Sequence, residues 1–144
     1  MSPIGSRHAA CVNRLNAILS QANPQGFIVS VRNPLTVDDF SEPEPDLALL
    51  HVKADYYQGD HPRPSDVILL VEVADSTLEF DRGTKLPLYA RNKIPAVILV
   101  NLPGNLLEFH SEPAGNEYRS VRMFRAGESF NFAGVRFEVS KILS

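Results

Sequence analysis

The residues of this sequence with the clearest capacity for chemistry are two acids and a lysine, Asp46, Glu72 and Lys85. Asp46 follows a proline in "EPD", Glu72 lies 26 residues later in an apolar run, and Lys85 lies 13 residues beyond Glu72. If neighbouring strands bring the acids together, their charges repel unless a cation joins them. Carboxylates, a backbone carbonyl and water are ligands that Mg²⁺ prefers. The pattern therefore indicates a divalent-metal site, in which Lys85 orients an attacking water or offsets the charge on a phosphate.

Each of these residues also has an ordinary structural interpretation. Asp46 could cap the turn that precedes a strand, as aspartate does after proline. Glu72 could be held by Arg82 or Arg91 in a structural ion pair, and Lys85 could be a solvated helix residue. The residues alone leave the structural and functional interpretations open.

The segment that carries Glu72 is "VILLVEVA", residues 67–74. Five apolar residues in succession predict a strand buried on both faces, which favours a central and parallel strand. An acid in such a strand is costly, because a carboxylate that leaves water without a partner loses several kcal/mol. Glu72 therefore requires a cation or a hydrogen-bond donor beside it.

The elements expected to position these residues form an α/β sandwich with a mixed sheet. Apolar spacing predicts helices over residues 7–21 and 81–93. Because proline is tolerated only in a first helical turn, Pro87 requires the second helix either to begin near Thr84 or to bend. Turns are predicted at "NPQG" (23–26) and, as type II, at "LPGN" (102–105). The predicted strands are residues 27–32, 46–52, 67–74, 96–100, 106–110, 117–124 and 135–139.

The composition indicates one cytoplasmic domain, residues 1–144, with 44% apolar and 22% charged residues. A net charge of −3 argues against a protein that coats nucleic acid by charge alone. The N-terminal "MSPIGSRHAACV" lacks the order of a signal peptide, and no stretch approaches the roughly 20 apolar residues of a membrane span. Cys11 is the single cysteine, expected in the core, while His51, His61 and His110 lack metal-ligand spacing and are expected to be structural or exposed.

The pattern "PD…VEVADST…D…K…Y" resembles the Uma-two family of restriction endonucleases, a bacterial branch of the PD-(D/E)xK nuclease superfamily. The resemblance extends over nearly the whole chain, through "GSRH", "EPDLALL", "LLVEVADSTLEFDRGTKLPLYA" and "IPAVILVNLPGN". It implies a restriction-endonuclease-like core and Mg²⁺- or Mn²⁺-dependent hydrolysis of DNA phosphodiester bonds. It also implies that Asp46 and Glu72 are the metal-binding carboxylates and that the carbonyl of Val73 is a third ligand.

The superfamily usually places its lysine two residues after the glutamate, where this chain has Ala74. The resemblance instead places the lysine on the following helix, at Lys85. Asp81 and Tyr89 lie four residues before and after Lys85, on the same face of a continuous helix. They are candidates for orienting the lysine or contacting substrate, although Asp81 could equally be an N-cap and Tyr89 a core residue. His8, near the start of the first helix, is a further candidate for lining the site.

The chain departs from the family in its N-terminal part. Family members usually carry a preceding segment with a Tyr-Glu…Gly-Glu-like pattern, whereas this chain begins at the "MSP" that follows that segment. Residues 1–37 contain no acid, so an early glutamate of the site is missing. A second interpretation follows, that of a catalytically degenerate nuclease-fold scaffold or interaction module. The nuclease interpretation predicts a homodimer, because cutting both strands of DNA needs two sites.

Overall fold

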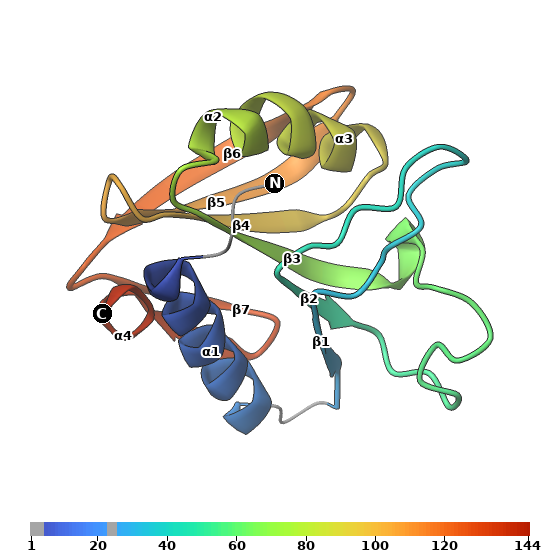
Figure 1. Cartoon of the computed structure of the whole chain (residues 1–144), viewed down its shortest axis with the longest axis horizontal. Coiled ribbons are helices and arrows are strands. Elements are labelled where there is room, and N and C mark those ends of the chain that lie inside the picture. The colour runs from blue at the N-terminus through green and yellow to red at the C-terminus, as the bar shows by residue number, and fades with distance from the viewer. Residues whose placement is uncertain (1–4, 23–25) are drawn as a thin grey trace.

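In a computed structural model of the chain, which describes residues 5–22 and 26–144, the centre is a six-stranded sheet (Figure 1). The strands follow one another across the sheet in chain order. They are β1 (Ile28–Val31), β2 (Leu47–Leu50), β3 (Val67–Ala74), β4 (Ala96–Asn101), β5 (Leu106–Ala114) and β6 (Glu117–Arg125). Strands β3 and β4 are parallel and the other neighbours are antiparallel. The predicted mixed sheet is therefore confirmed, and residues 67–74 form a central strand that is parallel to one neighbour only.

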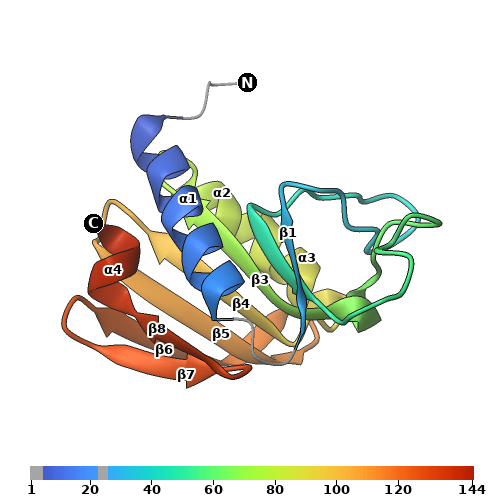
Figure 2. The ribbon, with the colours of Figure 1, turned by 90° about the horizontal axis from the view of Figure 1, so that it is seen from below.

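Each face of the sheet is covered by a different layer (Figures 1 and 2). One layer contains helix α1 (Ser6–Gln21), the hairpin of β7 (Ser129–Phe132) and β8 (Val135–Glu138), and the short helix α4 (Val139–Leu143). Its core includes Leu15, Leu19, Val71, Ile98 and Phe137, all at most 2% exposed. The opposite layer is the helical segment α2–η2–α3, which packs on Leu70, Ala74, Val97 and Leu99.

The alternation of side chains along β3 decides which layer meets the acid. Val71 and Val73 point into the core beneath α1, whereas Leu70 and Ala74 point into the core beneath α3. Because side chains alternate along a strand, Glu72 shares the face of Leu70 and Ala74. Glu72 is 2% exposed, so its carboxyl group must be satisfied by the helical segment above it.

That helical segment contains one wide turn. Helix α2 (Leu78–Phe80) leads into a single π-helical turn, η2 (Asp81–Lys85), and then into α3 (Leu86–Arg91). The amide of Leu86 donates to the carbonyl of Asp81, five residues earlier. Pro87 follows at once, where an ordinary helix would set its ring against the carbonyl four residues before. Of the two alternatives for this helix, a start near Thr84 is wrong, because the helix begins at Leu78 and a π turn lets it contain the proline.

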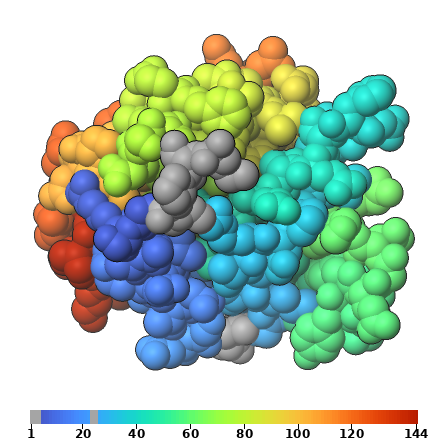
Figure 3. Space-filling model, viewed as in Figure 1, coloured from blue at the N-terminus to red at the C-terminus, as the bar shows by residue number. Residues whose placement is uncertain are grey.

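Several shorter features differ from the predictions. The turn at residues 102–105 is present, but type II is wrong, since the left-handed residue is Asn105 (φ 56°) and not Gly104. A 3₁₀ turn, η1 (Pro64–Asp66), directly precedes β3, and β7 and α4 were not predicted. Most of the turn predicted at residues 23–26 lies outside the described residues. In Figure 3, the loops that flank β2, about residues 33–46 and 51–66, project from one side of the molecule. Within the described ranges, no helix is long and apolar enough to cross a membrane.

Candidate active site

The antiparallel pairing of β2 with β3 brings the two predicted acids together. Leu47 pairs with Val71, so Asp46, one residue before β2, lies opposite Glu72. The amide of Asp46 donates to Oε1 of Glu72 at 3.3 Å, and the amide of Val73 donates to Oδ2 of Asp46 at 2.8 Å. Both carboxyl groups are buried, with Asp46 6% and Glu72 2% exposed. The two acids are thus linked through the backbone amides of Asp46 and Val73 at the end of the central strands.

The helical segment supplies the partners of Glu72. Nζ of Lys85 lies 3.2 Å from Oε2 of Glu72, and the hydroxyl of Tyr89 donates to the same oxygen at 2.7 Å. Arg82 and Arg91, the partners considered from the sequence, do not fill this role. The π turn carries Lys85 over the sheet, and Tyr89, fully buried one turn later, fixes the orientation of the carboxyl group.

Asp81 forms the next contact outward. Its Oδ1 lies 3.4 Å from Nζ of Lys85, and its Oδ2 accepts a hydrogen bond from the hydroxyl of Thr77 at 3.0 Å. That Oδ1 is buried without a hydrogen bond and has only the looser ion pair. Asp81 is itself 2% exposed. A cap for the helix was one interpretation from the sequence, but the side chain instead holds Lys85 between two carboxylates.

Asp46 is partnered from the opposite layer. Nε2 of His8, on α1, lies 3.2 Å from Oδ2 of Asp46, and Nε of Arg32 lies 3.8 Å from Oδ1. The other ring nitrogen of His8, Nδ1, is buried without a hydrogen bond. Arg32 follows β1 directly and was not predicted. Its position after the alternating strand "FIVSV" was the only sequence signal for it. In the structure, that strand is antiparallel to β2, which follows Asp46.

Burial and charge together set the protonation of the site. Burial raises the pKa of Glu72 to about 7, and the charge of Asp46 adds to the rise while Lys85 opposes it. Burial alone would lower the pKa of Lys85, but the charges of Glu72 and Asp81 outweigh burial and raise it. Burial and the adjacent Glu72 also raise the pKa of the Tyr89 hydroxyl. At neutral pH, Lys85 is therefore an ammonium, Tyr89 a neutral hydrogen-bond donor, and Glu72 a carboxyl group at its point of titration.

The donor set fits a hard divalent cation held mainly by two side chains. Within the described ranges, no three His, Cys, Asp or Glu residues form a ready metal-binding group. Asp46 and Glu72 offer carboxylate oxygens, the type of ligand that Mg²⁺ binds while it keeps several waters. Burial is the main cause of the raised pKa of Glu72, and a cation beside the carboxyl group would favour its ionised form. Val73 shows its amide bonded to Asp46, and the role of its carbonyl as a ligand stays a prediction.

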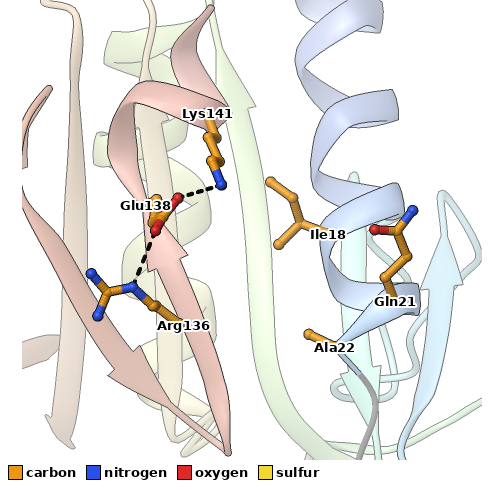
Figure 4. Close-up of a pocket in the computed structure, with 6 residues that line it drawn as sticks. All are labelled: Ile18, Gln21, Ala22, Arg136, Glu138 and Lys141. Atoms are coloured by element: carbon orange, nitrogen blue, oxygen red, sulfur yellow. Dashed lines mark hydrogen bonds and ion pairs between the residues drawn. The ribbon is translucent and has the colours of Figure 1, made fainter.

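The surface pocket shown in Figure 4 is not lined by Asp46 or Glu72. It has a volume of about 290 Å³ and lies between the C-terminal end of α1 and the segment from β8 to α4. His8, by contrast, is at the N-terminal end of α1. The charged residues that line the pocket pair with one another. Glu138 accepts a hydrogen bond from Arg136 at 3.2 Å and lies 2.7 Å from Nζ of Lys141. We therefore assign no chemistry to it.

The six-stranded mixed sheet and the layers on its two faces form an α/β domain, and comparisons with known proteins show its family and its fold. The model of the Uma2 family, described as "Putative restriction endonuclease", matches residues 1–140, so the chain belongs to this family. A crystal structure of "a putative nuclease belonging to DUF820" from Anabaena variabilis superposes with a TM-score of 0.66 at 9% identity. The match covers 99% of this chain and 83% of that one, and at this identity it establishes the fold alone. No curated protein matches.

Proposed function

We propose that this chain is a metal-dependent endonuclease that hydrolyses DNA phosphodiester bonds. The observation that carries the proposal is the pairing of Asp46 and Glu72 across β2 and β3, with the ammonium of Lys85 3.2 Å from Glu72. Membership of a family described as restriction endonucleases is consistent with it. Two buried acids on neighbouring strands with a lysine beside one of them are expensive to maintain, which favours a chemical use for the cluster.

Asp46 and Glu72 are the residues that would hold Mg²⁺ or Mn²⁺, with the carbonyl of Val73 as a proposed third ligand. Such an ion, when bound, supplies a water of lowered pKa and neutralises charge on the phosphate. The chain's own contribution is to present both carboxylates from rigid strands, locked by the amides of Asp46 and Val73. Rigid support of this kind keeps the site in one geometry before substrate arrives.

Lys85 acts as a cation and a hydrogen-bond donor rather than a base, because its raised pKa keeps it protonated at neutral pH. It can thereby orient the attacking water or offset charge on the phosphate. Asp81 and Tyr89 are positioning residues in this scheme. Asp81 restrains the ammonium, and Tyr89 holds Oε2 of Glu72 through a 2.7 Å hydrogen bond. His8 restrains Asp46 from the α1 side.

Cleavage of supercoiled plasmid in Mn²⁺ tests the proposal. The isosteric variants Asp46→Asn and Glu72→Gln are expected to lose nicking, each by at least 100-fold, while keeping the shape of the site. Glu79→Gln is a matched control, because Glu79 is exposed on the adjacent helix α2. Nicking by the Asp46→Asn, Glu72→Gln double variant at the wild-type rate would refute the proposal.

A scaffold without catalysis is the competing function, and one observation favours it. The acids already have internal partners, since His8 contacts Asp46 and Lys85 contacts Glu72. A thermal melting scan separates the two functions, because an ion at 100 times its Kd adds about 2.7 kcal/mol to the free energy of unfolding. A scaffold predicts no rise in Tm with Mn²⁺, and a nuclease predicts a rise that Glu72→Gln removes.

We further propose that the chain works as a homodimer, since cleavage of both DNA strands requires two sites. Light scattering coupled to size-exclusion chromatography, with and without duplex DNA, measures this directly. A mass near 31.8 kDa, twice that of the chain of 15.9 kDa, is the expected result. A single-chain mass under both conditions, in a preparation that linearises plasmid DNA, would contradict it.

A further inference from the structure

A second buried glutamate lies on the same face of the sheet as Glu72. Leu99 of β4 pairs with Glu72 of β3 on one side and with Glu108 of β5 on the other. The two glutamates are therefore level with each other and two strands apart, about 10 Å at the usual strand spacing. Glu108 is 2% exposed and stands between Leu107 and Phe109, the same acid-in-apolar-strand pattern that marks Glu72. That pattern could have predicted Glu108 from the sequence.

Glu108 holds an arginine from the π turn. Nη2 of Arg82 donates to Oε2 of Glu108, and Nε2 of His110 lies 3.1 Å from Oε1. Burial opposes ionisation of Glu108, but the hydrogen bonds from His110 and Arg82 outweigh it and lower the pKa of the carboxyl group. Glu108 is thus an ionised anchor with both oxygens occupied, unlike Glu72 with its raised pKa.

The anchored arginine retains donors for a ligand. A guanidinium carries five N–H donors in a planar fork, and Nη2 of Arg82 is the atom that contacts Glu108. The side chain of Arg82 is 39% exposed, compared with 3% for that of Glu108. Lys85, three residues later on the same turn, is 29% exposed. The π turn therefore presents two partly exposed cations, each of which contacts a buried glutamate through a terminal nitrogen.

The same end of the sheet carries further positive charge. Arg7 donates through Nη2 to the carbonyl of Leu102, which follows β4, at 2.8 Å. Arg32 lies beside Asp46, which precedes β2. Together with Arg82 and Lys85, these arginines place four cationic side chains at the end of the sheet that carries Asp46 and Glu72, and all but Arg7 also pair with an acid. Cations gathered in one place can attract a polyanion even though the whole chain has a net charge of −3.

We propose that Arg82 binds a backbone phosphate of the DNA next to the phosphate that is cleaved, with Glu108 and His110 as the residues that position its guanidinium. This inference rests on the proposed nuclease function. A planar fork held through one nitrogen, Nη2, can offer its remaining N–H groups to two phosphate oxygens, and an ammonium cannot reproduce that geometry. Glu108 and Glu72 are two strands apart in the sheet, about 10 Å at the usual strand spacing. Arg82, which contacts Glu108, therefore lies beside the proposed metal site and outside it.

Binding to a fluorescein-labelled DNA duplex, measured by anisotropy between 50 and 200 mM KCl, tests the assignment. The measurements use chains that carry Asp46→Asn, so that no cleavage occurs. Loss of one phosphate contact is expected to reduce the slope of log affinity against log salt by about 0.9. Arg82→Gln should show that reduction. Arg91→Gln, which removes an exposed arginine at the end of α3, should leave the slope unchanged.

Arg82→Lys keeps the charge and preserves the fold if Arg82→Gln proves unstable. It is expected to keep the salt slope while weakening DNA binding about tenfold, because the bidentate contact is lost. Glu108→Gln tests the positioning role in the active chain. There the KM for DNA should rise about tenfold while kcat and the Mn²⁺ affinity stay unchanged, a split that general loss of folding would not produce.

The outcomes separate this inference from the proposed function. An unchanged salt slope in Arg82→Gln, or wild-type affinity in Arg82→Lys, overturns the role of Arg82 in DNA binding. If the wild-type chain nicks DNA in the same study, the proposed nuclease function still stands. Failure of the wild-type chain to nick, combined with a reduced slope in Arg82→Gln, overturns the nuclease and retains Arg82 as a DNA contact. Absence of any DNA binding overturns both.

Discussion

Glu72 should make the stability of the metal-free protein depend on pH in an unusual direction. Its pKa in the folded chain is about 7, against an ordinary value of 4.5. Between these values the folded chain holds a proton that the unfolded chain has released. The free energy of unfolding therefore falls as the pH rises through this window, because the folded state binds more protons than the unfolded state. Most paired carboxyl groups have the opposite effect.

The size of the effect follows from the same shift. One pKa unit corresponds to 1.36 kcal/mol, so the stability that is fully present below pH 4.5 falls by about 3 kcal/mol by the time the pH exceeds 7. The carboxyl group is 2% exposed, so solvent screening takes little from this figure. The variant Glu72→Gln cannot titrate and keeps a similar shape, which isolates the contribution of this one group.

Urea denaturation in EDTA at pH 5, 6, 7 and 8 measures the difference. The wild-type chain is expected to lose about 2.5 kcal/mol relative to Glu72→Gln between pH 5 and pH 8, slightly less than the full shift because the unfolded chain is already partly ionised at pH 5. Saturating Mn²⁺ should abolish this loss, because the ion keeps Glu72 ionised and binds the folded chain. A difference between the two chains that stays constant from pH 5 to pH 8 in EDTA would refute the reasoning, since Glu72 would then be ionised throughout.

Three further substitutions give independent checks by urea denaturation. Tyr89→Phe removes the donor to Glu72 and should cost about 1.5–3 kcal/mol at pH 8, where the acid is ionised; equal stability there would contradict the contact. Gly83→Ala should stabilise by about 0.5–1 kcal/mol, because the added methyl meets nothing within 4 Å inside an exposed helical turn, and a loss would show that the π turn requires glycine. Gly104→Ala should destabilise by about 1–3 kcal/mol, because its Cβ would lie 2.7 Å from Nδ2 of Asn101; a neutral result would mean that Asn101 moves freely.

The two acids could be predicted from the sequence because local patterns mark them. Glu72 interrupts an apolar strand, and a proline places Asp46 at the start of the preceding predicted strand. In the structure the two strands are antiparallel neighbours, and the pairing of Leu47 with Val71 places Asp46 opposite Glu72. Asp46 and Glu72 could therefore be predicted because the sequence marks burial and strand ends strongly at these two positions.

The partners of the acids depend on features with weaker local signals. Over a dozen residues, an α-helix and a helix with one π turn have nearly the same apolar spacing. The sequence therefore did not reveal that η2 would bring Lys85 to Glu72 and Arg82 to Glu108. Arg82 and Glu108 are 26 residues apart along the chain, and their contact depends on the pairing of β5 with β4. Short elements such as α4, five residues long, are below the length at which periodicity is informative.

The central claim is that Asp46 and Glu72 bind one divalent ion between them. A crystal structure of the protein soaked in Mn²⁺, with data collected at the manganese absorption edge, tests it most directly. We expect an anomalous peak within coordinating distance of both carboxyl groups, with the contacts from His8 and Lys85 lengthened. Full occupancy of Mn²⁺ at another place, with His8 still on Asp46 and Lys85 still on Glu72, would contradict the claim.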